Sequence, residues 1–153
     1  MKKYFLLFVL IILSSCNSND DENSTKKADA QAEKDLQGRW NWVSTTSGVD
    51  GTIKTAASAN TTIVIEFSGS NFKKYTNGVL TMDTTFKVVT QQLNEDGPLQ
   101  TIVTGGYMPI NNVSGIVSDT SHEGFKIVNN KLLMNHFCNK CSNSEYVRAQ
   151  EVF

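Results

Sequence analysis

The 153-residue chain lacks most of the patterns that mark an enzyme. It has only two histidines, His122 and His136, and no Gly-x-Ser-x-Gly turn, so nothing local supports a Ser-His-Asp site. Gly105-Gly106 is not followed by the Lys-Thr pair or helix that a phosphate-binding loop needs. We therefore predict no catalytic residues, no cofactor and a role other than enzyme.

The chain also lacks a cluster of basic residues. Its 14 lysines and arginines face 15 aspartates and glutamates, whereas a nucleic-acid partner requires grouped cations. No polybasic patch is present for anionic lipid either. Nor does any segment approach the 18 apolar residues of a spanning helix. The sequence therefore excludes nucleic-acid binding and gives no sign of a membrane-spanning helix.

A short basic start, Lys2 and Lys3, precedes an unbroken apolar run from Tyr4 to Leu13. Ten residues are too few to cross a bilayer as helix, which takes about 20, but they suit the apolar region of a signal peptide. Leu13-Ser14-Ser15-Cys16 follows directly and resembles the lipobox of bacterial lipoproteins, whose cysteine takes a diacylglycerol and becomes the new N-terminus. The alternatives are an uncleaved anchor or a secreted protein with an incidental Cys16.

The lipobox resemblance implies a signal peptide over residues 1–15 and a lipid on Cys16, with the membrane as partner. Lipoproteins of this kind carry two or three acyl chains, which is enough for stable anchoring. Removing residues 1–15 leaves 12 basic against 15 acidic side chains, a net charge of about −3. Asp20-Asp21-Glu22 resembles a surface-export signal of Bacteroidetes lipoproteins, although it is equally a solvated charge run. We expect a location in the cell envelope, at the outer membrane or the cell surface.

Residues 16–34 read as a flexible acidic and polar linker. From Asn17 to Lys34 there is no aromatic or large aliphatic side chain, so the segment buries too little apolar surface to offset its ordering entropy. At most, Ala28–Lys34 forms a frayed helical turn. We place the folded domain at residues 35–153.

Residues 35–153 show short alternating runs separated by turn signals, with almost no helical periodicity. Thr61–Phe67 places Ile63, Ile65 and Phe67 on one face, and Asn77-Gly78 is a strong hairpin signal. Gly48–Asn60 is expected to be a long loop that covers one barrel end. The expected strands are 38–45, 61–67, 72–76, 79–88, 99–104, 113–118, 125–128, 131–134 and 145–150. This spacing predicts an all-β fold, a small antiparallel up-and-down β-barrel of about eight strands, with a sandwich as the alternative.

Gly38-Arg39-Trp40 opens the domain and Tyr146-Val147-Arg148 lies near its end. With the lipobox, the Phe72–Gly78 hairpin and Lys131-Leu132-Leu133, this order resembles the small lipocalin-like lipoproteins of Bacteroidetes over residues 36–149. The middle-turn and C-terminal-helix signatures of many lipocalins are absent. The resemblance implies a barrel whose closed end Trp40 plugs, with Arg148 packed across the indole. The alternative is another β fold in which both are ordinary core and rim residues.

A lipocalin-like barrel of eight strands holds at most one small ligand. Its candidate lining is the apolar inward face, which comprises Ile63, Ile65, Phe67, Phe86, Val88 and Phe125. These residues predict a small apolar ligand, and plain core packing is the alternative. A protein-interaction or inhibitor module is the second functional reading, with loops 48–60 and 105–112 as its contact surfaces.

His136, Cys138 and Cys141 form His-x-Cys-x-x-Cys between two expected strands. In an oxidising envelope, a Cys138–Cys141 disulfide is the simplest interpretation. A zinc or copper site, joined by His122 only if the fold brings it close, is a second. Thiol–disulfide exchange and free thiols complete the set. We favour the disulfide and predict no bound metal.

Overall fold

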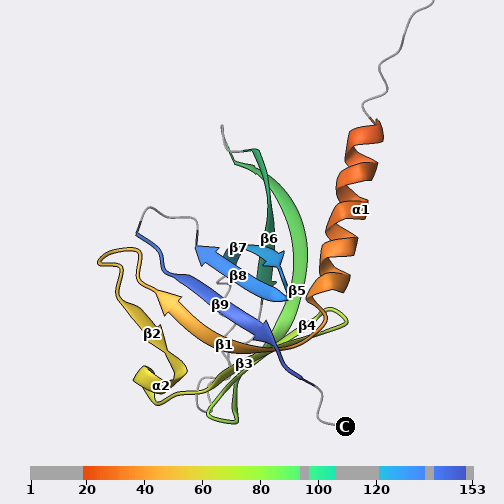
Figure 1. Ribbon diagram of the computed structural model, residues 1–153. Coiled ribbons are helices and arrows are strands. Elements are labelled where there is room, and N and C mark those ends of the chain that lie inside the picture. The colour runs from red at the N-terminus through yellow and green to blue at the C-terminus, as the bar shows by residue number, and fades with distance from the viewer. Residues whose placement is uncertain (1–18, 94–96, 106–120, 137–139, 151–153) are drawn as a thin grey trace, which may run out of the picture.

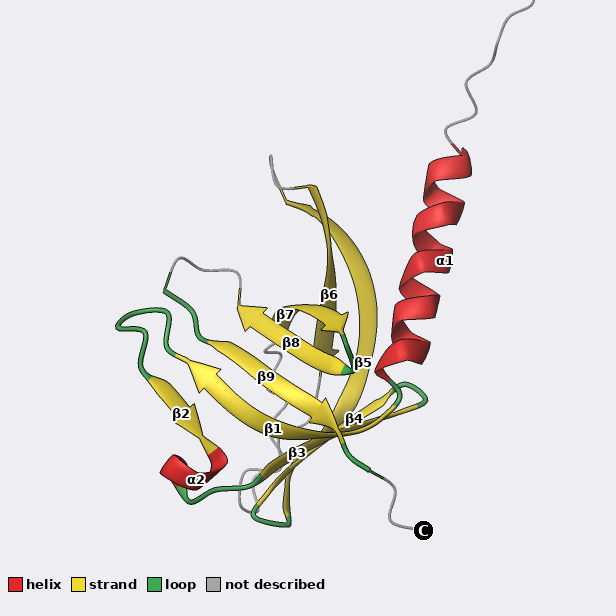
Figure 2. Ribbon diagram, in the orientation of Figure 1, coloured by secondary structure: helices red, strands yellow, loops and turns green. Residues whose placement is uncertain are grey.

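The described part of the protein, which we present from a computed structural model, contains nine strands and two helices (Figures 1 and 2). The structure describes residues 19–93, 97–105, 121–136 and 140–150. The elements are α1 (Asn19–Leu36), β1 (Gly38–Thr46), β2 (Ile53–Thr55), α2 (Ala56–Ala59), β3 (Ile63–Ser68), β4 (Asn71–Thr76), β5 (Val79–Leu93), β6 (Gly97–Gly105), β7 (Ser121–Val128), β8 (Lys131–His136) and β9 (Asn143–Arg148).

From β3 to β9 each strand pairs antiparallel with the next, and β9 pairs back onto β1, from Trp40 opposite Arg148 to Thr46 opposite Asn143. This closes an eight-stranded barrel and confirms the predicted up-and-down fold. The hairpin between β4 and β5 turns at Asn77 and Gly78, whose φ values of 50° and 78° are those that a tight hairpin requires. Closure removes the open edges that a flat sheet would expose.

The segment between β1 and β3 differs from the expected long loop. The range 48–60 contains β2 and α2. Strand β2 pairs with the C-terminal end of β1, at Ser44–Thr46. Helix α2 is capped by Thr55, which exchanges reciprocal hydrogen bonds with Ser58. Gly48 lies against the β8–β9 connection: a Cβ there would come within 2.1 Å of the Cys141 carbonyl oxygen. The segment is therefore a folded flap along β1 and not a free lid. The expected strand 113–118 lies outside the described residues.

Helix α1 is the main departure from the sequence-based expectation. The flexible linker predicted for residues 16–34 is wrong from residue 19 onward, because α1 is helical over Asn19–Leu36. Pairs four residues apart support it: Lys26 donates to Glu22 at 2.7 Å, and Gln31 donates to Asp35 at 2.8 Å. Among the helix residues whose side chains are described, only Ala32 and Leu36 join the barrel core. The sequence of the helix therefore carries almost no apolar periodicity that would have predicted it. The folded domain thus begins within α1 and not at residue 35.

Two carboxylates attach α1 to the edge of β5. Beyond Thr85 this edge has no partner in β4, and its amides at alternate residues point outward. Val88 N donates to Glu33 Oε1 at 2.9 Å, while Thr90 donates through N and Oγ1 to Asp29 at 3.2 and 2.6 Å. Four helix residues rise about 6 Å and two strand residues about 6.7 Å, so carboxylates four residues apart match amides two residues apart. The helix therefore completes the hydrogen bonding of an exposed strand edge.

The closed end of the barrel is organised around Trp40, which is fully buried. The Arg148 guanidinium lies 4.2 Å from the centroid of the indole ring. Arg148 also donates to the carbonyls of Gln37 at 2.5 Å and Asp35 at 2.7 Å, and Trp40 Nε1 donates to Leu36 O at 2.7 Å. The carbonyls of Asp35 and Leu36, which lie at the end of α1 and have no partner within the helix, are thereby satisfied. The predicted pair meets here and joins α1, β1 and β9.

Removing both edge carboxylates should loosen α1. In an Asp29→Ala, Glu33→Ala variant we expect the free energy of unfolding to fall by about 1–3 kcal/mol, because three hydrogen bonds are lost. Urea unfolding measures the loss, and the amides of Val88 and Thr90 should exchange faster. Glu22→Ala is the control, since Glu22 sits on the same helix in an exposed pair worth little. Equal exchange rates in both variants would contradict the edge contact.

Arg148→Met keeps the length of the side chain but removes its donors and its charge. We expect a loss of about 2–4 kcal/mol in unfolding free energy from the carbonyl hydrogen bonds and the indole contact. Arg39→Met is the matched control, because Arg39 is over half exposed, 3.5 Å from Glu66 and 5.4 Å from the Tyr75 ring. Similar losses of unfolding free energy in the two variants, measured by denaturant unfolding, would show that the contacts of Arg148 stabilise the fold no more than those of Arg39.

Candidate functional site

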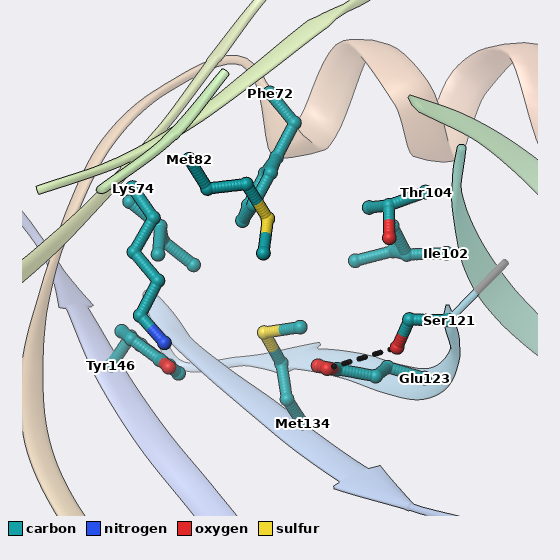
Figure 3. Close-up of a pocket in the computed structure, with 10 residues that line it drawn as sticks. Phe72, Lys74, Met82, Ile102, Thr104, Ser121, Glu123, Met134 and Tyr146 are labelled. Carbon is teal, nitrogen blue, oxygen red and sulfur yellow. Dashed lines mark hydrogen bonds between the residues drawn. The ribbon is translucent and has the colours of Figure 1, made fainter. Parts of the chain in front are cut away.

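The barrel lumen contains a cavity of about 80 Å³. Every barrel strand except β1 contributes a side chain to it (Figure 3). Half of the lining is apolar and half is polar or charged. The lining residues are Ile65, Phe72, Lys74, Met82, Ile102, Thr104, Ser121, Glu123, Met134 and Tyr146.

An aromatic layer fills the lumen below this cavity. The Phe67 ring lies 5.2 Å from that of Phe72 and 4.8 Å from that of Phe86, centroid to centroid. Phe67 and Phe86 are buried in the hydrophobic core together with Val88 and Phe125. Tilted and edge-on arrangements at these distances are the favoured geometries for packed aromatic rings.

The predicted apolar lining therefore meets the cavity at one residue. Ile65 lines it, whereas Phe67, Phe86, Val88 and Phe125 are core residues and Ile63 packs against the core. These five pack in or against the core, and Phe125 also borders two more open hollows, so their contact with a ligand stays a prediction. Alternation identifies which side chains point inward, but it does not show how far along the barrel the lumen stays open.

Two charged side chains face the cavity, and the sequence analysis missed both. Lys74 follows Phe72 on the inward face of β4, and Glu123 precedes Phe125 on that of β7. The Ser121 hydroxyl donates a long hydrogen bond, 3.5 Å, to Glu123 Oε1. The signal available in the sequence is a charge at an inward position whose neighbour two residues away is aromatic.

Tyr146 brings a neutral hydroxyl to the same space. The side chain is 8% exposed, and burial together with the charge of Glu123 raises the pKa of its phenol to about 12, against a weaker opposing hydrogen bond from Ser144. Burial dominates because it penalises the phenolate. Tyr146 therefore stays protonated at neutral pH and has a hydroxyl proton to donate.

Of the predicted cysteine motif, the described Cys141 is not among the residues that line this cavity. Cys138 falls outside the described residues, so its disulfide with Cys141 and the metal alternative with His136 stay predictions. His122 is exposed on β7, where its Nδ1 lies 3.2 Å from Gln91 Nε2. Within the described residues, no three His, Cys, Asp or Glu side chains are grouped to hold a metal ion.

The predicted lipidation site, Cys16, also falls outside the described residues. Over the part of the chain that the structure describes, no helix has the length and apolar character needed to traverse a membrane. Comparison with family models, curated proteins and solved structures finds no match for this chain. Its function must therefore be inferred from the chemistry of the lumen.

Tyr146 should make the protein lose stability in alkali. A phenol whose pKa rises from 10 to about 12 on folding contributes stability that is complete below pH 10 and is lost as pH rises through 12. Between about pH 9 and 12, the free energy of unfolding measured with denaturant should fall more steeply for wild type than for Tyr146→Phe. Tyr75→Phe, which retains Tyr146, should decline as wild type does. Parallel curves for wild type and Tyr146→Phe would refute this assignment.

Proposed function

We propose that the chain is a lipid-anchored protein of the cell envelope whose lipocalin-like barrel binds a small ligand in its lumen. The observation that carries the proposal is a cavity with Lys74 and Glu123 on its wall, next to the aromatic contacts of Phe67, Phe72 and Phe86. A barrel interior built for stability alone favours apolar side chains, because an enclosed charge loses its hydration. Charges that border an apolar hollow are the usual composition of a binding site.

The size of the cavity limits the ligand. Pockets for drug-sized ligands span roughly 300–1,000 Å³, whereas a water molecule occupies about 30 Å³ in the liquid. A cavity of about 80 Å³ accommodates a molecule of only a few heavy atoms. The half-buried Lys74 and Met82 have long, flexible side chains, so their rotation toward the mouth would enlarge the site. The ligand would contact Ile65 and Met134 with its apolar part.

The placement of α1 fits an anchor at Cys16. The helix begins at Asn19, three residues after the predicted lipidation site, and its 18 residues extend about 27 Å. Its C-terminal half is fixed to β5 through Asp29 and Glu33. A lipid at Cys16 would thus hold the barrel through a helical spacer instead of a loose tether.

An interaction module is the second candidate function, and the β1–β2 flap favours it. Val49 is 73% exposed and Ile53 is 61% exposed. Among the described strands, β2 pairs only with β1, so its other edge is available for an added strand. Lys54, at the centre of β2, is the kind of edge charge that limits unspecific pairing.

Native mass spectrometry of the full chain, extracted from the envelope in mild detergent, tests the proposal. We expect a covalent diacylglycerol on Cys16 and a small non-covalent adduct. Thr104→Phe should abolish the adduct because it fills the cavity, while Thr85→Phe adds the same mass at an exposed site on β5 and should retain it. An adduct of equal abundance in both variants would place the ligand outside the lumen. Absence of any adduct, in wild type also, would favour the interaction module.

A further inference from the structure

We infer that the lumen selects a small zwitterion, an α-amino acid with a short side chain. Its carboxylate would lie against Lys74 and its ammonium group against Glu123. The inference rests on the proposed function, because it names the ligand class of the same cavity. It also changes the expectation of an apolar ligand into one of a polar ligand with a small apolar part.

The two charges come from separate walls of the barrel and border the same cavity. Along the inward face of β4, buried Phe72 at the aromatic layer is followed by Lys74; along β7, Glu123 is followed by buried Phe125. Strands β5 and β6 separate the two in the sheet. Figure 3 shows Lys74 and Glu123 facing the same hollow, with the Met134 side chain between their charged ends.

Opposite charges across a hollow discriminate among small ions. An anion that reaches Lys74 also meets the field of Glu123, and a cation that reaches Glu123 meets that of Lys74. A zwitterion pairs an opposite charge with each of the two side chains. Because it has no net charge, its binding leaves the net charge of the lumen unchanged. A carboxylate has about four lone-pair sites, so Glu123 can accept a ligand ammonium group while it keeps the hydrogen bond from Ser121 and its other interactions.

Tyr146 adds a hydrogen-bond donor to the site. Its side chain lines the same cavity from β9, and the charge of Glu123 acts on its phenol. Because this phenol remains protonated, it can donate a hydrogen bond to the carboxylate of a ligand in the cavity. Glycine or alanine is also the size of molecule that about 80 Å³ admits, with the side-chain methyl group against Met82 and Met134, whose thioethers adapt to small shapes.

Isothermal titration of the full chain in mild detergent tests the ligand class. Glycine and L-alanine should bind, whereas acetate and methylammonium, which carry one charge each, should bind at least tenfold more weakly. Lys74→Met and Glu123→Gln should each weaken alanine binding about tenfold to a hundredfold. Lys73→Met and Glu145→Gln should leave it unchanged, since these residues form the ion pairs with Asp83 and Lys131 and do not line the cavity.

Each outcome decides the matter. Acetate binding as tight as alanine, unaffected by Glu123→Gln, would overturn the inference in favour of an anion site. A lumen adduct from the envelope together with no amino-acid binding would overturn the ligand class and leave the proposed function standing. If neither a lumen adduct nor amino-acid binding is seen, the inferred ligand class and the proposed function both fail. The ligand series on wild-type protein keeps the test valid even where a variant does not fold.

Discussion

The contact between Arg148 and Trp40 is the constraint on which the rest of the structure depends. The guanidinium covers an indole that is fully buried at the closed end, and its nitrogens bind the carbonyls of Asp35 and Gln37. One side chain from the last strand thus fixes the first strand and the end of the helix. Gly38 makes room for it: with φ of 109°, a Cβ there would be strained and would lie 3.1 Å from Arg148 Nη1.

Much of the barrel could be predicted from local sequence, because the strands are half buried and therefore alternate. Ile63, Ile65 and Phe67 mark one face of β3, and Asn77-Gly78 fixes the hairpin that follows β4. Helix α1 could not be predicted in this way. It binds the barrel mainly through side-chain hydrogen bonds to the β5 edge, and such contacts leave no apolar periodicity in the sequence.

The candidate site illustrates a different limit. Alternation shows that Lys74 and Phe72 share a face, but only the register of neighbouring strands shows that Lys74 and Glu123 reach the same hollow. The apolar residues that the pattern favours most, Phe67 and Phe86 among them, fill the core because they are large. Here the charged side chains that line the cavity, Lys74 and Glu123, are the inward residues that an apolar alternation does not identify.

Closure of the barrel also sets when this protein can fold. The hydrogen bond from Arg148 to Gln37 joins residues 111 positions apart, and the pairing of β1 with β9 spans a similar distance. Contacts of such high sequence separation form late and slowly, since a long loop must first be closed. A ribosome that has completed β8 still holds an open sheet with two unpaired edges. The barrel therefore cannot close before β9 has been synthesised, and until then the chain can form only an open sheet.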